Sequence, residues 1–223
     1  MFPMNTREPS HTIEEYLEAI HKLGRQRTPV LGARLAERMG VSAPTVTGVL
    51  KRMAKDGLVE EDARKGVRLT PRGRELGESM VRKHRLAERL LTDILGLDLD
   101  TVHTEACRFE HALSPEVADR LWAVLGYPTT CPHGYTIPGA EPLPTEAYVL
   151  TSAAEGAEVV VRSVPEEDAA LLKYLTEKGI RPGARLRVVQ VAPFRGPFTL
   201  ATSQGEVALG VEVAAQIGVD LEP

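Results

Sequence analysis

Two helical patterns joined by the short turn Gly40-Val41-Ser42 are the feature that most restricts the fold of this chain. Residues 33–39 predict a short helix, which Gly40 can end in the left-handed conformation. Ser42 can cap the next helix, which carries an apolar stripe and is followed by Gly57. The stripe consists of Val46, Val49, Leu50 and Met53. Two helices connected by so short a turn are typical of the helix-turn-helix motif.

The segments on either side extend this motif. Apolar residues at helical spacing predict an earlier helix over residues 13–23, with Thr12 and Glu15 forming a capping box at its start. Residues 58–61 and 67–70 predict two strands around a basic turn. Three helices followed by a hairpin indicate a winged helix-turn-helix domain over residues 1–74.

The N-terminal part of the chain has the charge that DNA binding requires. Residues 1–75 contain 14 Lys and Arg against 10 Asp and Glu, whereas the remaining residues contain 13 against 21. A basic module attracts phosphates even in a chain with a net charge of −4. The alternative is a solvated face on an ordinary three-helix domain. We expect DNA contacts, mostly to phosphates, from Ser42, Pro44, Thr45, Thr47, Lys51, Arg52, Arg64, Lys65 and Arg68.

The rest of the chain divides into a helical and a β-rich part. A long helix over residues 71–95 and two shorter ones ending near residues 113 and 126 predict a central helical domain over residues 75–140. The proline-rich stretch 127–144 predicts an irregular linker, whose boundaries we place at 141–147. Short β-rich runs around one helix at 166–178 predict a small β-barrel over residues 148–223. The predicted fold class is therefore mainly α with β.

Side chains that bind metals gather in the central helices. Spacings of i, i+4, i+7 and i+8 place one set on a single helical face, and an i, i+4 pair shares a face of the preceding helix. Each residue alone has an ordinary structural role, so the prediction depends on their joint spacing. Imidazole, carboxylate and thiol groups on facing helices can hold zinc, iron or manganese. The two sets are His103, Cys107, Glu110 and His111, and His84 with Glu88.

Two cysteines, Cys107 and Cys131, are too few for a disulfide framework. Cys131 and His133 lie in the proline-rich stretch without a second pair of ligands nearby, so we expect them to lie outside the metal site. Because no apolar run approaches the roughly 20 residues of a membrane span and no signal peptide is apparent, we expect a cytoplasmic protein without membrane association.

Residues 82–91 and 102–111 closely resemble the iron-dependent branch of the diphtheria-toxin-repressor family. The similarity also includes residues 36–38, 42–47 and 137–139, the wing and the C-terminal β-rich domain. The resemblance implies a homodimeric, metal-activated transcriptional repressor that binds a palindromic operator in double-stranded DNA and controls metal homeostasis genes. It further implies two metal sites per subunit, dimerisation through the central helices and an SH3-like C-terminal domain.

The resemblance also implies roles for individual residues. It implies an ancillary metal site at His84, Glu88 and His103, and a regulatory site at Cys107, Glu110 and His111. The iron branch has a methionine where this chain has Glu15, whereas the manganese branch has carboxylates that match Glu15 and Glu18 but lacks Cys107. Because carboxylates favour harder ions, we expect Mn(II) with Fe(II) as a second metal.

The family's C-terminal ligands to the ancillary site correspond to Ser163 and Glu166. Alternatively, Glu166 only complements the positive end of the helix that follows it. Two other functions compete with the repressor. A metalloenzyme would turn over a substrate, but no His-Glu-x-x-His motif is present and we expect no enzymatic activity. A metal-independent winged-helix regulator would bind its operator equally well in chelator.

Overall fold

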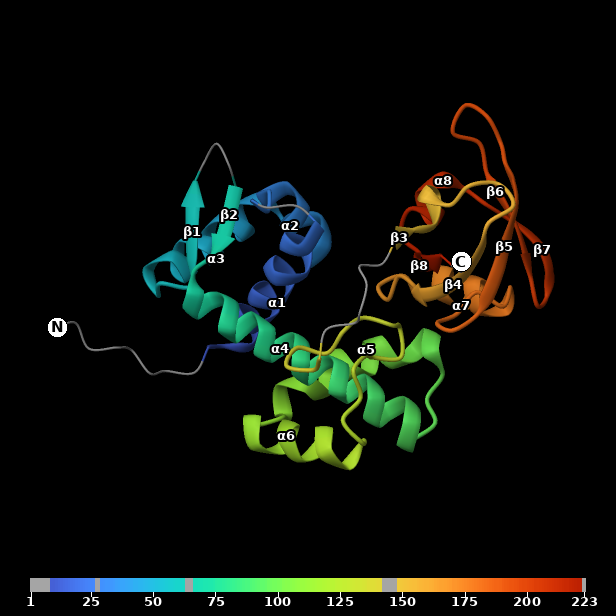
Figure 1. Cartoon of the computed structure of the whole chain (residues 1–223). Helices are drawn as coiled ribbons and strands as arrows, with labels where there is room; N and C mark the ends of the chain where they lie inside the picture. The colour runs from blue at the N-terminus through green and yellow to red at the C-terminus, as the bar shows by residue number, and fades with distance from the viewer. Residues whose placement is uncertain (1–8, 27–28, 63–65, 142–147, 222–223) are drawn as a thin grey trace. The chain divides into compact units, whose positions relative to one another are not determined.

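The computed structural model describes residues 9–26, 29–62, 66–141 and 148–221, and the chain forms two compact units (Figure 1). The N-terminal unit contains residues 1–83 and 110–115, and the C-terminal unit contains residues 84–109 and 116–223. Helix α4 (Pro71–Arg89) therefore contributes residues to both. Within the described ranges, no helix is long and apolar enough to cross a membrane.

The N-terminal unit is a winged helix-turn-helix, as predicted. Its helices are α1 (His11–Gln26), α2 (Gly32–Met39) and α3 (Ala43–Lys55), and the wing pairs β1 (Val59–Asp62) with β2 (Gly66–Leu69) in antiparallel register. The predicted apolar stripe of α3 packs against apolar residues of α1, α2 and the wing. Gly40 adopts a left-handed φ of 62°, and the Ser42 side chain accepts a hydrogen bond from the Thr45 amide, which confirms both predicted helix ends.

Helix α1 begins earlier than predicted. The Ser10 carbonyl accepts hydrogen bonds from the amides of Ile13 and Glu14, so the helix starts at His11. Thr12 is then an interior residue of the first turn, and the predicted capping box of Thr12 and Glu15 is wrong. This shift changes which side chains of the first turn share a face.

A short segment before α2 completes the wing. Val30 forms an antiparallel bridge with Val67 through two backbone hydrogen bonds of 2.9 and 2.8 Å. Gly66 allows this approach, because its φ is +86° and a Cβ there would overlap the Val30 carbonyl. The wing residues Arg64 and Lys65 lie outside the described residues.

In the C-terminal unit, α4 ends in a short π-helix, η1 (Leu90–Ile94), and α5 (Leu99–Phe109) follows. A 3-10 helix, η2 (Glu110–Ala112), continues α5, and α6 (Pro115–Val124) comes next. The predicted α-helix to residue 113 therefore ends at Phe109. Glu110 and His111 are placed by the 3-10 turn instead of the α-helical face that also carries His103, and they belong to the N-terminal unit.

The C-terminal β-rich domain is a single antiparallel sheet in the order β3-β8-β4-β5-β6-β7. The predicted strands appear as β4 (Glu158–Ser163), β5 (Arg185–Val191), β6 (Phe198–Thr202) and β7 (Gly205–Leu209), and β3 (Tyr148–Val149) and β8 (Gly218–Leu221) join them. The short helices are η3 (Leu150–Ser152), α7 (Ala169–Glu177) and α8 (Val211–Ala214). A buried apolar core lies within this domain, and Leu99 of α5 packs against it.

The proline-rich stretch is irregular, as predicted, and up to residue 141 it forms a folded loop; residues 142–147 of the predicted linker lie outside the described residues. Thr130 and Thr136 form a β-bridge across the loop, and the guanidinium of Arg89 donates to the Thr130 carbonyl at 2.7 Å. Arg85 donates to the Thr136 carbonyl and lies 5.5 Å from the centre of the Tyr135 ring. Helix α4 thus holds both sides of the loop.

The other side of this loop is attached to β4. The Val164 amide donates to the His133 carbonyl at 3.1 Å. Gly134, with a φ of +91°, lies so close to the Arg162 carbonyl that a Cβ would overlap it. Loop residues 131–134 therefore lie between α4 and the C-terminal sheet.

Candidate metal centre

The centre of the C-terminal unit contains one carboxylate oxygen surrounded by three imidazoles. Oε1 of Glu88 lies 3.0 Å from Nε2 of His84, 3.3 Å from Nδ1 of His103 and 3.1 Å from Nδ1 of His133. His84, Glu88 and His133 are completely buried. The residues come from α4, α5 and the loop before the sheet, so tertiary folding brings them together.

The Glu88 carboxylate is ionised in this setting. Burial raises its pKa, but the charge of His84 and hydrogen bonds from His103, His133 and His84 outweigh this effect, and the pKa of Glu88 falls well below its usual value. The second oxygen, Oε2, is buried and accepts no hydrogen bond from any residue that the structure describes. A buried anionic oxygen without a partner is costly, and a cation would satisfy it.

Glu88 belongs to the buried group, which we define as Glu88, Cys131, His133 and Glu166. One ligand atom from each residue lies within 4.8 Å of the others, and all four residues are buried. Nε2 of His133 lies 3.1 Å from the Leu99 carbonyl, which can accept a hydrogen bond from it, and Nδ1 faces Glu88. Burial is the main cause that raises the pKa of the Cys131 thiol well above its usual value, so this thiol is protonated in the absence of a metal.

A second set, the thiol group, consists of His84, His103 and Cys107. The Cys107 sulfur lies 4.0 Å from Nδ1 of His84 and 3.8 Å from Nε2 of His103. Burial lowers the pKa of His103, but hydrogen bonds with Cys107 and Glu88 outweigh it and raise this pKa to about 9. Burial raises the pKa of Cys107, and hydrogen bonds from the two histidines reverse the effect and lower it. The two shifts therefore favour an imidazolium at His103 and a thiolate at Cys107.

The N-terminal unit contains a third set, the surface group of His11, Glu14 and His111. Nδ1 of His111 lies 2.9 Å from Oε2 of Glu14, and the His11 and His111 rings stack with centroids 4.5 Å apart. Glu15, the expected ligand from α1, is exposed and belongs to none of these sets. The earlier start of α1 therefore pairs Glu14, instead of Glu15, with His111.

Comparison with known proteins gives these groups a context. Residues 9–67 match the protein-family model described as the N-terminal DNA-binding domain of iron-dependent repressors. Residues 70–139 match the metal-binding and dimerisation domain of the same repressors, and residues 148–221 match the FeoA domain. The iron-dependent repressor IdeR of Mycobacterium tuberculosis is 39% identical over 223 residues, covering 94% of this chain and 96% of the relative.

This chain belongs to the iron-dependent repressor family. The diphtheria toxin repressor of Corynebacterium diphtheriae is 48% identical to this repressor over 132 residues, covering 59% of the chain and 58% of the relative. A manganese-dependent transcriptional repressor in complex with manganese has 34% identity and a TM-score of 0.84, covering 94% of this chain and 100% of that one. The manganese regulator SloR has 32% identity and a TM-score of 0.80, covering 97% and 100%.

Membership of this family confirms the expected fold class, with a winged helix-turn-helix and an SH3-like FeoA domain, and the expected function. The repressor is a metal-dependent transcriptional regulator and not an enzyme. Iron and manganese both occur as the metals of its relatives.

Two other predicted ligands of this repressor, Glu18 and Glu110, lie close together in the N-terminal unit, with one carboxylate oxygen of each within 4.8 Å of the other. Glu18 is buried in the N-terminal unit, and its Oε1 lies 2.8 Å from Nζ of Lys22. Glu110 is also buried, and its Oε1 lies 3.6 Å from Nε2 of His111. Ser163 lies against Gly218 in the sheet and belongs to none of the three groups.

Glu166 does not cap the helix that follows it. Helix α7 begins at Ala169, and the Asp168 carboxylate accepts the hydrogen bond of the Leu171 amide at 3.0 Å. The expected helix start at Glu166 is wrong, and Glu166 is a member of the buried group instead.

The sequence analysis did not predict four of the ligand candidates, which are His11, Glu14, Cys131 and His133. Cys131 and His133 lack a second pair nearby in the chain because their partners come from α4 and from the segment after β4. The spacing of Cys131-Pro132-His133, with one intervening residue, was the available signal. For His11 and Glu14 the signal was their i, i+3 spacing before the apolar stripe of α1.

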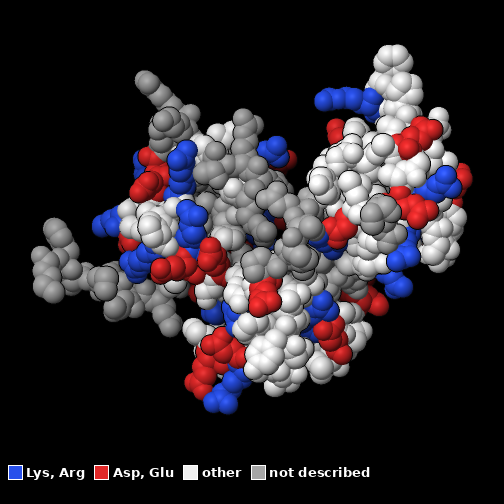
Figure 2. Space-filling model, in the orientation of Figure 1, with Lys and Arg blue, Asp and Glu red and all other residues white. Residues whose placement is uncertain are grey.

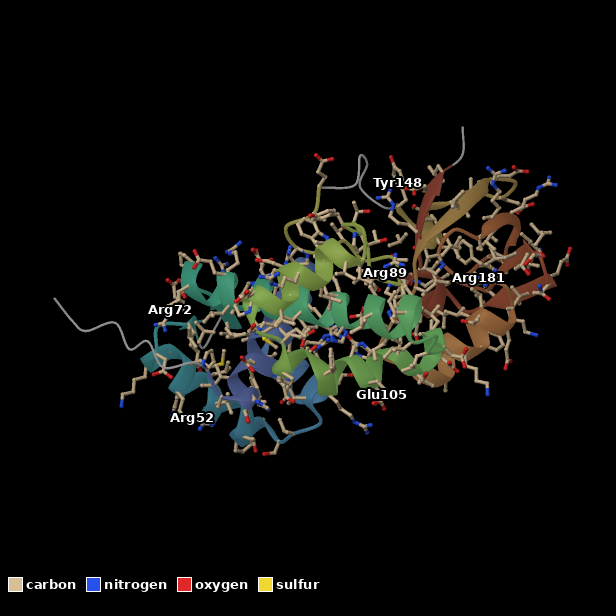
Figure 3. The ribbon with its side chains drawn as sticks, turned by 90° about the horizontal axis from the view of Figure 1, so that it is seen from below. Arg52, Arg72, Arg89, Glu105, Tyr148 and Arg181 are labelled. Atoms are coloured by element: carbon tan, nitrogen blue, oxygen red, sulfur yellow. The ribbon has the colours of Figure 1, made fainter. Side chains whose placement is uncertain are left out.

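The polar face of α3 carries the side chains expected to contact DNA. Ser42, Pro44, Thr45, Thr47, Lys51 and Arg52 are exposed, and Arg68 is exposed on β2. Figure 3 shows Arg52 projecting from the ribbon of α3. On the face shown in Figure 2, Lys and Arg side chains of the N-terminal unit are interspersed with Asp and Glu.

Proposed function

We propose that this repressor is activated by Fe(II) or Mn(II) bound in the C-terminal unit, and that it then binds operators of metal homeostasis genes. The buried group is the observation that carries the proposal. Four metal-binding side chains from three segments converge there without exposure to solvent, and such groups are rarely left buried unless they are paired or coordinate a metal.

The donor atoms fit this class of ion. The buried group offers a thiol, an imidazole and two carboxylates, and the orphaned Oε2 of Glu88 is one of its oxygens. The thiol group offers a second set of nitrogen and sulfur donors, so we propose two metals per chain. A bound ion supplies positive charge that holds the carboxylates and thiolates together.

The structure changes our expectation of which metal binds more tightly. The expected preference for Mn(II) depended on Glu15, which is exposed. Both groups in the C-terminal unit contain a cysteine, and sulfur and imidazole donors favour Fe(II) over Mn(II). We therefore propose that Fe(II) binds with higher affinity and that Mn(II) also activates.

The protein arranges these donors before an ion arrives. The Leu99 carbonyl holds His133 in the tautomer whose Nδ1 can bind a metal. The guanidinium groups of Arg85 and Arg89 hold the loop that carries Cys131 and His133. These contacts order the loop and the His133 ring before an ion binds, so metal binding costs less conformational entropy.

The DNA contacts follow from the winged helix. We propose that α3 enters the major groove and that Thr45, Thr47, Lys51 and Arg52 contact DNA, mostly through phosphates. Ser42 and Pro44 at the start of α3, and Arg64, Lys65 and Arg68 on the wing, complete the proposed interface. A dimer would present two such helices to a palindromic operator.

For dimerisation we propose the exposed apolar face of α6. Val117 and Val124 lie two helical turns apart on this helix, and both are exposed in the single chain. Apolar side chains at this spacing form a continuous stripe that a second copy can cover. We further propose that the repressor acts in the cytoplasm.

The decisive experiment is a DNA-binding titration. DNA sequences are first selected from a random library with metal-loaded protein, and their affinity is then measured anaerobically in Fe(II), Mn(II), Zn(II) and chelator. We expect binding with Fe(II) and Mn(II) and little binding in chelator. Equal binding in chelator would establish a metal-independent regulator and contradict the proposal.

A further inference from the structure

The hairpin of β5 and β6 ends in a tight turn that presents an exposed phenylalanine. The Gly196 amide donates to the Pro193 carbonyl at 3.1 Å, so Phe194 and Arg195 are the two central residues of the turn. Their φ angles are 59° and 61°, and two positive values are typical of the type I′ turns that join antiparallel strands. The loop extends beyond the other elements of the C-terminal β-rich domain (Figure 1).

This turn is strained, and folding does not compensate for the strain. Positive φ angles favour Gly or Asn, because the Cβ of other residues comes too close to the following carbonyl oxygen. Phe194 is 100% exposed, so it buries no apolar area in return. The Ala192 amide donates to the Pro197 carbonyl at 3.1 Å, which fixes the base of the turn. Strained backbone of this kind is typical of functional positions.

The segment that contains the hairpin is basic, whereas the rest of the domain is acidic. Residues 178–205 contain five Lys and Arg and no Asp or Glu, and the remainder of residues 148–221 contains two against nine. Glu158 on β4 lies opposite Arg187 and offsets part of its charge, but Arg195 lies in the turn, beyond the last paired residues of β5 and β6. The five basic residues, all exposed, are Lys178, Arg181, Arg185, Arg187 and Arg195.

We propose that the β5–β6 hairpin is a second DNA-binding element of this repressor, which inserts Phe194 into the minor groove and places Arg195 beside the flanking phosphates. Two-stranded antiparallel ribbons fit the grooves of DNA. Phenylalanine is one of the apolar side chains that proteins insert between base steps from the minor groove, where arginine also binds. The turn therefore carries the two side chains that this contact requires.

Double-stranded DNA explains the composition of the turn better than other negatively charged surfaces. A single exposed phenylalanine offers too little apolar area to hold a protein stably at a lipid bilayer. The winged helix already brings the chain onto DNA, so the hairpin of the same chain meets DNA at a high effective concentration. A turn whose backbone is fixed beforehand also loses little conformational entropy on binding.

The experiment measures the affinity of full-length protein, loaded with Fe(II) or Mn(II), for a selected operator extended by about two helical turns, roughly 20 base pairs, on each side. The test variants are Phe194→Ala and Arg195→Ala. The controls are Tyr174→Ala and Lys173→Ala, which remove an exposed aromatic ring and an exposed positive charge from α7 of the same domain.

The two test variants should differ in their response to salt. Phe194→Ala should weaken binding about tenfold and keep the wild-type slope of log affinity against log salt, because it removes an uncharged contact with the bases. Arg195→Ala should lower this slope by about 0.9, because it removes one phosphate contact. Both controls should match wild type. Wild-type affinity in Phe194→Ala, or a wild-type slope in Arg195→Ala, would overturn the proposal.

Two further variants identify the partner and test the strain. Phe194→benzoylphenylalanine should form a photochemical crosslink to the operator, whereas a crosslink only to a second copy of the chain would contradict a DNA contact. Phe194→Gly should unfold at a higher temperature than wild type, because it relieves the positive φ, and should bind DNA as weakly as Phe194→Ala. A lower unfolding temperature would show that Phe194 supports the fold instead and would also count against the proposal.

Discussion

Oε1 of Glu88 lies 3.1 Å from Nδ1 of His133, and both side chains are completely buried. Glu88 belongs to α4 and His133 to the proline-rich loop, so this contact joins the helical core to the loop before the sheet. The same oxygen also contacts His84 and His103. The carboxylate therefore contacts three imidazoles at once, and its removal should affect both proposed metal sites.

Glu88→Gln should destabilise the metal-free protein and weaken metal binding. Removing one partner of a buried charged network typically costs about 3–5 kcal/mol, and the amide also removes a metal ligand. Chemical denaturation and Fe(II) or Mn(II) calorimetry measure the two effects. Glu105→Gln is the matched control, because this α5 carboxylate pairs with Arg108 in solvent and should change both values little. Wild-type affinity in Glu88→Gln would refute its role as a ligand.

Gly134→Ala should remove metal binding at the buried group without changing any ligand. A Cβ at this position would overlap the Arg162 carbonyl and force Cys131 and His133 away from Glu88. We expect at least a tenfold loss of affinity for one metal per chain. Gly156→Ala is the control, since its φ is also positive at +86° but a Cβ there meets no atom within 4 Å. Equal metal affinity in the two variants would contradict our placement of the loop.

The two cysteines should differ strongly in reactivity. The lowered pKa of Cys107 increases its thiolate fraction near neutral pH, and this cysteine is exposed, whereas Cys131 is buried with a raised pKa. In native, metal-free protein, iodoacetamide should modify Cys107 rapidly and Cys131 only after unfolding. Peptide mapping by mass spectrometry identifies the modified residue. Fe(II) should slow the modification of Cys107. If Cys131 were modified faster than Cys107 in the native protein, our assignment would be wrong.

Metal affinity at the thiol group should rise with pH up to about 9. His103 has its pKa raised to about 9, so a proton competes with the metal below that pH, and affinity should increase by about tenfold per pH unit for one released proton. The stability of the metal-free protein should change with pH in the opposite direction. Protonated His103 stabilises the folded state, and this contribution is fully present below its unfolded pKa of about 6.5 and is lost as pH rises through about 9. Denaturation and calorimetry at pH 6–9, with His103→Gln as comparison, test both trends. Identical pH profiles in wild type and His103→Gln would be incompatible with this assignment.

Arg52→Ala should weaken DNA binding for all sequences and reduce its salt dependence. Arg52 is exposed on α3, and loss of one phosphate contact lowers the slope of log affinity against log salt by about 0.9. Binding isotherms at several salt concentrations give the slope. Lys173→Ala removes an exposed positive charge from α7 and should retain the wild-type slope. If both variants had the same slope, Arg52 would not contact a phosphate.

Local patterns in the sequence predicted the secondary structure of this protein well. The Gly40 helix end, the Ser42 cap and the apolar stripe of α3 depend on neighbouring residues and on helical periodicity, so they could be read directly from the chain. The same holds for His84 with Glu88 and for His103 with Cys107, because each pair lies one helical turn apart on one helix.

Tertiary structure decided which ligands meet. Nothing near Cys131 and His133 in the sequence indicates that they join Glu88 and Glu166, because this contact depends on Arg85 and Arg89 holding the loop and on Gly134 approaching β4. Likewise, the start of α1 at His11 and the change to a 3-10 turn after Phe109 placed Glu14 beside His111. The sequence by itself therefore determined the ligands that share one helix, whereas the groupings across segments depended on long-range packing, which local periodicity does not encode.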